Sequence, residues 1–249
     1  MLNYVEYGKE NKYDDDIFFQ KYSQMSRSQQ GLAGAGEWET LRKLLPDFKD
    51  KRVLDLGCGY GWHCIYAMEH GASSVVGVDI SHKMLEVAKE KTHFPQVEYK
   101  CCAIEDVEFP EESFDVILSS LAFHYVADYE ILVKKIYRIL KSGGNLVFTV
   151  EHPVFTAYGT QDWYYNEKGE ILHFPVDNYY YEGKRTAVFL GEKVTKFHRT
   201  LTTYLNTLLS NGFIINHIVE PQPPENMMDI PGMQDEMRRP MMLIVSANK

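Results

Sequence analysis

Cysteine is scarce in this sequence, and its spacing argues against the common cysteine-based sites. The 249 residues include only Cys58, Cys64, Cys101 and Cys102. Neither close pair has the C-x-x-C spacing, or the companion cluster, that is typical of a zinc site or a redox motif. We therefore expect reduced thiols, no bound metal and a cytoplasmic location.

Long apolar runs and an excess of basic residues are also missing. No apolar run approaches the roughly 18 residues that cross a bilayer, and the opening MLNYVEYGKENKYDDD lacks a basic segment followed by an apolar one. We expect neither secretion nor membrane insertion. The formal charge is −9, from 26 basic and 35 acidic residues. Such a charge repels nucleic acid and anionic membranes, so a small or uncharged substrate is favoured.

Strands and helices alternate through the middle of the chain. A first helix runs from Glu37 to Pro46, and Ser81 is the expected N-cap of a later one. The pattern predicts strands at 51–57, 74–80, 97–104, 114–123 and 145–153, and helices at 62–71, 81–91 and 128–144, the last ended by two glycines. This rhythm is typical of a parallel sheet covered by helices on both faces.

Three segments lie outside this alternation. Residues 1–36 are polar and aromatic, and GLAGAG at 31–36 would break a helix, so we predict a mobile N-terminal arm. Residues 154–200 are rich in aromatic residues without a helical period, which favours a lid insertion. A helix at 200–212 and strands at 213–221 and 241–249 complete the chain. We expect one domain, divided into the arm (1–36), a cofactor-binding core (37–153), the lid (154–200) and a terminal helix and hairpin (201–249).

The segment VLDLGCGYG carries the clearest chemical signal. It ends a strand, turns on glycines and opens a helix, so backbone N–H groups can approach a ligand where side chains would clash. Asp79 closes the next strand, where a carboxylate can accept hydrogen bonds from both hydroxyls of a ribose. Together they predict an adenosine-containing ligand. The alternative is that Asp79 only caps the next helix, a role for which Ser81 lies closer.

The glycine turn is not the dinucleotide-binding pattern G-x-G-x-x-G. Gly57, Gly59 and Gly61 form G-x-G-x-G after an Asp-Leu pair, which resembles the class I S-adenosylmethionine-dependent methyltransferases over about residues 51–150. EDVEFPEESFDVI further resembles the D-L-P-F-x-x-x-S-F-D-x-V of the type 11 subgroup, which mostly methylates small molecules. The resemblance implies S-adenosylmethionine as cofactor and S-adenosylhomocysteine as product. It also implies a Rossmann-like, doubly wound α/β fold whose seven-stranded, mostly parallel sheet has an antiparallel last strand.

The resemblance also implies a set of cofactor-binding residues. Ile80 and Met84 would sandwich the adenine, and the loop after the third strand would read its amino edge, although the family commonly has Asp where this chain has Ala103. From the arm, Arg27 could pair with the cofactor carboxylate or be a solvated surface residue. The full set comprises Tyr22, Arg27, Asp55, Gly57, Cys58, Gly59, Asp79, Ile80, Met84, Ala103, Ile104, Glu105, Ser119 and Leu121.

Catalytic and acceptor-binding residues are harder to predict, because positioning and desolvation can supply most of the acceleration of a methyl transfer. His124 and His152 follow two strands and are candidate bases. The alternative is that each packs against a loop, with Glu151 orienting His152. Candidate acceptor contacts in the lid are Tyr158, Trp163, Tyr181 and His198, or these side chains form a small satellite core.

We therefore predict a monomeric or homodimeric enzyme that methylates O, N or C of a small-molecule acceptor. Two other classes stay open. One is a non-catalytic cofactor-binding protein of the same fold, because fold alone does not prove catalysis. The other is an NAD-linked oxidoreductase, which the glycine spacing disfavours.

Overall fold

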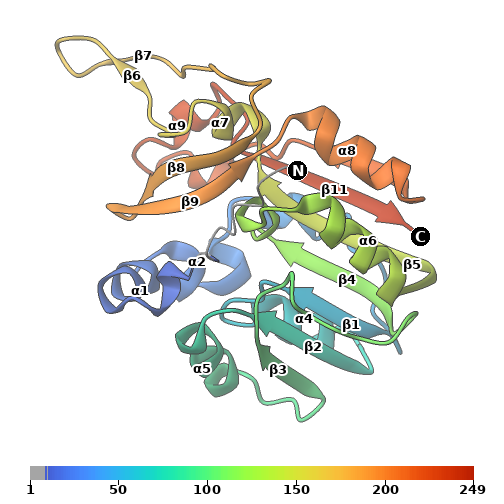
Figure 1. Cartoon of the computed structure of the whole chain (residues 1–249). Helices are drawn as coiled ribbons and strands as arrows, with labels where there is room; N and C mark the ends of the chain where they lie inside the picture. The colour runs from blue at the N-terminus through green and yellow to red at the C-terminus, as the bar shows by residue number, and fades with distance from the viewer. Residues whose placement is uncertain (1–8, 10) are drawn as a thin grey trace.

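A seven-stranded sheet forms the centre of the molecule (Figure 1). The structure is a computed structural model and describes residues 9 and 11–249; residues 1–8 and 10 of the predicted arm lie outside the described residues. The strand order is β10-β11-β5-β4-β1-β2-β3. The strands are β1 (Arg52–Leu56), β2 (Ser74–Asp79), β3 (Val97–Cys101), β4 (Phe114–Ser120), β5 (Leu140–Glu151), β10 (Ile214–Val219) and β11 (Met242–Asn248). Strands β1 to β5 pair in parallel, and β11 runs antiparallel to both β5 and β10. The predicted doubly wound, Rossmann-like sheet is confirmed.

Helices cover both faces of the sheet, and each face has its own apolar core. On one face, Leu54 and Ile117 pack with residues of α6 (Tyr129–Ile139) and α8 (Leu201–Ser210). On the other face, Val53 and Val116 pack with residues of α3 (Trp38–Leu41), α4 (Trp62–Glu69) and α5 (His82–Lys91). Successive strand residues alternate between the two cores, as the pleat of a strand requires. These strands are buried on both sides, which accounts for their nearly continuous apolar sequence.

Two of the predicted helices extend well beyond those observed. The helix predicted at 128–144 ends at Ile139, and Leu140 already belongs to β5, where it pairs with Phe114 of β4. The glycines at 143 and 144 therefore lie inside a strand and do not end the helix. The physical reason is the pairing of Leu140 with Phe114, a contact between distant segments that the helical repeat of the sequence does not show. The first predicted helix is likewise only one turn, Trp38–Leu41.

The arm and the predicted lid both contain regular structure. The arm holds η1 (Lys12–Asp14), α1 (Asp16–Ser23) and α2 (Ser26–Gln29), with α2 ending just before GLAGAG. The segment 154–200 is covered by α7 (Pro153–Ala157) and two hairpins, β6 (Tyr164–Tyr165) with β7 (Ile171–His173), and β8 (Gly183–Phe189) with β9 (Glu192–His198). Hairpin β6–β7 projects from the body in Figure 1. Phe18 of α1 packs against Ala187 and Val194 of the second hairpin, so arm and insertion share a small core.

The part of the chain that the structure describes contains no helix that is both long and apolar enough to span a membrane.

The N-cap of α6 makes a separable contribution to stability. Asp128 accepts a hydrogen bond from the backbone N–H of Ile131 at 3.0 Å. We expect Asp128→Ala to lower the free energy of unfolding in urea by about 1 kcal/mol, because an N–H of the first turn loses its acceptor. Glu130→Ala is the control. Glu130 lies on the same turn and forms an exposed ion pair with Lys134, so its removal should change the free energy of unfolding little. Equal losses in both variants would show that the cap contributes nothing specific.

Candidate active site

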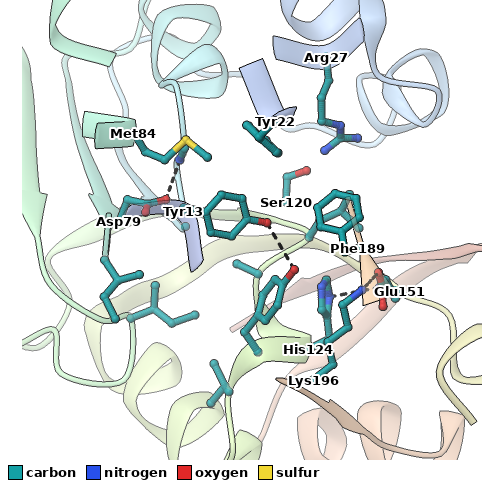
Figure 2. Close-up of a pocket in the computed structure, with 18 of the residues that line it drawn as sticks. Tyr13, Tyr22, Arg27, Asp79, Met84, Ser120, His124, Glu151, Phe189 and Lys196 are labelled. Carbon is teal, nitrogen blue, oxygen red and sulfur yellow. Dashed lines mark hydrogen bonds and ion pairs between the residues drawn. The ribbon is translucent and has the colours of Figure 1, made fainter. Parts of the chain in front are cut away.

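A cavity of about 400 Å³ opens at the carboxyl ends of the parallel strands (Figure 2). Gly57 follows β1, Asp79 ends β2, Ser120 ends β4 and Glu151 ends β5, and all four line it. The arm and hairpin β8–β9 supply the remaining walls. Twelve of the residues predicted for the site line this cavity: Tyr22, Arg27, Gly57, Gly59, Asp79, Ile80, Met84, Ala103, Ile104, Glu105, Leu121 and His124.

The glycine turn is shaped by close backbone approach. Gly57 has φ +79° and a Cβ there would overlap the Cβ of Ala122, so only glycine fits. Its N–H and that of Cys58 donate to the carbonyl of Val78 at 2.8 and 2.9 Å, which fixes the turn against β2. The next glycine, Gly59, faces the cavity. A Cβ placed on it would have no other atom within 4 Å. The turn therefore leaves open space at Gly59, where a ligand can approach the backbone closely.

Asp79 joins the glycine turn to the start of α5. Its Oδ2 accepts from Gly59 N–H at 2.8 Å and its Oδ1 from Ser81 N–H at 2.9 Å. Ser81 itself is the N-cap, since its Oγ accepts from Met84 N–H. Burial raises the pKa of Asp79. The carboxylate faces the cavity and retains lone pairs for further donors, so it does more than cap the helix.

Three of the predicted cofactor residues lie behind the cavity wall. Asp55 is 1% exposed and accepts from the Cys64 thiol at 3.4 Å, and burial raises the pKa of Asp55 to about 7. Ser119 donates its hydroxyl to the carbonyl of Leu56 at 2.7 Å. Cys58 is buried beside them. These side chains support the glycine turn from below and do not line the cavity.

The arm is fastened over the cavity by contacts that the sequence did not predict. Asp14 accepts from Ser81 Oγ at 2.6 Å and from Lys83 N–H at 3.1 Å, at the first turn of α5. Although partial burial opposes it, the hydrogen bond from Ser81 lowers the pKa of Asp14. The hydroxyls of Tyr13 and Tyr125 meet at 3.3 Å across the cavity (Figure 2). Asp14 is the first of three consecutive aspartates, and nothing in the sequence indicates that it would bind the start of α5.

Arg27 is held by a carboxylate of the protein. Its Nη2 donates to both oxygens of Glu37, at 2.6 and 2.8 Å, and Glu37 is 2% exposed. Arg27 is therefore not a solvated surface residue. The partner Glu37 was not predicted, because it is the first residue of an expected helix and its burial depends on the folded arm.

The opposite end of the cavity holds a cluster of polar side chains, which we call the Lys196 cluster: His124, Glu151, Gln161 and Lys196. Glu151 Oε1 pairs with Lys196 Nζ at 2.5 Å, and Glu151 Oε2 accepts from Gln161 Nε2 at 2.6 Å. Lys196 Nζ also donates to Gln161 Oε1 at 3.0 Å. The Lys196 side chain is 3% exposed, so this is a buried ion pair. Lys196 and Gln161 were missed, since neither stands in a recognisable motif.

Comparison with known proteins assigns the chain to a family. Residues 54–148 match the protein family described as a methyltransferase domain. A crystal structure of an S-adenosylmethionine-dependent methyltransferase from Mesorhizobium loti is 40% identical, with a TM-score of 0.81, covering 88% of this chain and 100% of its own. A second crystal structure, of a protein from Listeria monocytogenes described as a candidate for the same class, is 58% identical with a TM-score of 0.84. The match covers 88% of this chain and 99% of that protein. This chain belongs to the S-adenosylmethionine-dependent methyltransferases.

A full-length relative extends this similarity beyond the matched domain. An uncharacterized protein of Haemophilus influenzae is 34% identical over 250 residues, which span 95% of the methyltransferase chain and 96% of the relative. The similarity therefore includes the arm and the insertion as well as the core. The cofactor of this methyltransferase is S-adenosylmethionine, as predicted.

His124 lines the cavity of the methyltransferase but is a weak base. It is 2% exposed, and its Nδ1 accepts the backbone N–H of Glu151 at a long 3.4 Å. Burial lowers the pKa of His124 to about 4. The ring is therefore neutral at neutral pH, with its only free lone pair already facing a donor.

The structure places the other predicted catalytic and acceptor residues away from the cavity. His152 caps α7 through Val154 N–H at 3.1 Å and meets Glu220 at 2.9 Å, so its ring is turned from the cofactor side. His198 bonds Thr156 and the carbonyl of Tyr179. Trp163 packs against other side chains of the insertion and its neighbouring loop, and Tyr158 and Tyr181 are 45% and 75% exposed. The contacts of His198 and Trp163 fit the alternative that these side chains form a small satellite core. Neither side chain lines the cavity.

The buried state of His124 predicts a pH dependence of stability. Its folded pKa of about 4 lies below its ordinary 6.5, so between these values the unfolded chain binds the proton more readily. The free energy of unfolding should therefore fall as pH drops from 6.5 towards 4, by up to about 3 kcal/mol from this residue. In urea titrations at several pH values, His124→Gln should lose less stability over this window than the unmodified protein.

The comparison isolates His124 because His63, whose pKa burial also lowers to about 4, is present in both proteins. His217→Gln, at an exposed position of β10, is the matched control and should keep the original pH dependence. An unchanged dependence in His124→Gln would contradict the buried, neutral assignment.

Proposed function

We propose that this methyltransferase transfers a methyl group to an O, N or C atom of a small molecule bound beside the Lys196 cluster. The observation that carries the proposal is that one cavity is lined both by Asp79 with the glycine turn and by the Lys196 cluster. A methyl donor and a methyl acceptor bound at the two ends of this cavity would lie in the same enclosed space. Holding two reactants in this way supplies much of the acceleration of a bimolecular reaction.

The cofactor half of the proposal assigns roles to residues of the sheet edge. The backbone of the glycine turn, open to the cavity at Gly59, would contact the methionine part, and Asp79 would accept from the ribose hydroxyls. Ile80 and Met84 would pack on the adenine, with the loop 103–105 along its edge. Bound S-adenosylmethionine supplies an activated sulfonium methyl group.

The arm and the buried supports would act on the same ligand. Tyr22 and Arg27 would cover it from the arm, where Arg27 is already oriented by Glu37. Asp55, Cys58 and Ser119 would act indirectly, by holding the turn in shape. Leu121, with φ +54°, would present backbone to the methionine part. Ala103 leaves the adenine amino group to Glu105 or to backbone carbonyls.

The acceptor half favours a small molecule with an apolar body. Phe155, Phe189, Met241 and Met242 line it, and such walls exclude water while a few polar groups fix orientation. The net charge of −9 gives no basic surface for nucleic acid. His124 is a weak base and Glu151 is paired, so the proposed acceleration comes from positioning and desolvation. Membership of the methyltransferase family leaves no support for the NAD-linked alternative.

Calorimetric titration with S-adenosylmethionine, S-adenosylhomocysteine and NAD tests the cofactor assignment. We expect the first two to bind and NAD not to. Asp79→Ala should weaken S-adenosylmethionine binding by about 100-fold, because two hydrogen bonds from the ribose hydroxyls to a half-buried carboxylate are lost. Gly57→Val should abolish binding, since its side chain would fill the turn.

Asp229→Ala, at an exposed loop position, is the control and should bind as the unmodified protein does. Unchanged affinity in both Asp79→Ala and Gly57→Val would refute the assignment. Cofactor binding without methylation of any compound in a broad panel of small acceptors, assayed with methyl-labelled cofactor, would favour the non-catalytic alternative.

A further inference from the structure

The ammonium group of Lys196 is the distinctive feature of the acceptor half. Among the described residues it meets two oxygen acceptors, Glu151 Oε1 and Gln161 Oε1. An ammonium group has three N–H donors, so one is left for a ligand. The group also lies 5.5 Å from the ring centre of Phe189 and 6.0 Å from that of Tyr125, both of which line the cavity. The third donor is therefore available beside aromatic walls.

His124 supplies a second donor at the same end. Because its Nδ1 accepts the Glu151 backbone N–H, the ring proton of neutral His124 lies on Nε2. Lys196 and His124 come from β9 and from η3 (Phe123–Tyr125), which pack together, and Figure 2 shows both side chains converging next to Glu151. Two donors from two residues match the two oxygens of a carboxylate.

The charges around the cluster favour an anion over an amine. Glu151 already accepts from Lys196 and Gln161, so its carboxylate is largely satisfied within the protein. A carboxylate also needs no base to be charged at neutral pH, and the cluster offers none that is free. A negative group would further face the positive sulfonium of the donor in an enclosed site of low dielectric, where opposite charges attract strongly.

We propose that the acceptor is a small apolar or aromatic carboxylic acid, whose carboxylate is bound by Lys196 Nζ and His124 Nε2 with its body against Phe155 and Phe189. The proposal rests on the methyltransferase function above and names its substrate class. Lys196 and His124 act here as recognition residues.

Three phenyl compounds of nearly equal shape test the charge of the acceptor. Phenylacetate, 2-phenylacetamide and 2-phenylethylamine are titrated calorimetrically into protein saturated with S-adenosylhomocysteine. We expect phenylacetate to bind about tenfold more tightly than the amide, as a charge-assisted hydrogen bond implies, and the amine to bind weakest. Phenylacetate binding no tighter than the amide, or an amine that binds best, would overturn the proposal. The preceding titration with S-adenosylhomocysteine alone separates a failure of the cofactor function from a failure of this inference.

Variants of the ion pair give a second, independent test. Lys196→Met should reduce phenylacetate affinity about tenfold and leave S-adenosylhomocysteine affinity unchanged. Lys193→Met, the same substitution at an exposed position of the same strand, is the control and should bind as the unmodified protein does.

Glu151→Gln keeps the protein testable if Lys196→Met does not fold, because it retains the shape of the cluster. We expect it to strengthen phenylacetate binding, since the competing negative charge is removed, and to weaken binding of the amine. Weaker phenylacetate binding in Glu151→Gln, with cofactor binding intact, would show that the cluster does not recognise an anion.

Discussion

The carboxylate of Asp79 is the contact on which the cavity depends. It accepts from the amides of Gly59 and Ser81, so it joins the glycine turn after β1 to the start of α5 across the ends of two neighbouring strands. Even a half-buried carboxylate is costly unless it is hydrogen-bonded, and these two donors offset that cost. Ser81 then donates its hydroxyl to Asp14 of the arm. The wall of the cavity and the arm that covers it are therefore positioned by one connected set of hydrogen bonds.

The ion pair of Lys196 with Glu151 is the corresponding constraint at the other end. A buried ion pair contributes little net stability, but removing one partner leaves an uncompensated charge, so the pair strongly disfavours other arrangements. It fixes β9 of the insertion to the end of β5 in the central sheet. The apolar core that the insertion shares with the arm is small, built around Phe18, Ala187 and Val194. The polar cluster thus does much of the positioning that a larger core would otherwise do.

The central sheet and the cofactor half could be predicted because their signals are local. Strand and helix periods are read within a few residues, and the glycine turn and Asp79 lie at the ends of strands that the alternation already predicts. The acceptor half has no such signal. Glu151 and Lys196 are distant in sequence and meet only after the insertion folds, and aromatic composition does not say that Tyr181 faces solvent. The end of α6 was misplaced for a similar reason, since only the neighbouring strand shows that Leu140 belongs to the sheet.

The basicity of the cluster bears on the kind of acceptor the cavity can serve. His124 holds its proton on Nε2 with a pKa lowered by burial, and, although burial opposes it, the Lys196 ammonium group and the hydrogen bonds from Lys196 and Gln161 lower the pKa of Glu151. Neither group is suited to remove a proton from an acceptor at neutral pH. A compound that must be deprotonated in the site would therefore react slowly here, whereas one that enters with a lone pair already available needs only to be held and desolvated. A small carboxylic acid is already ionised when it enters the cavity and needs no base for that, so the weak bases and the donors of Lys196 and His124 favour the same class of acceptor.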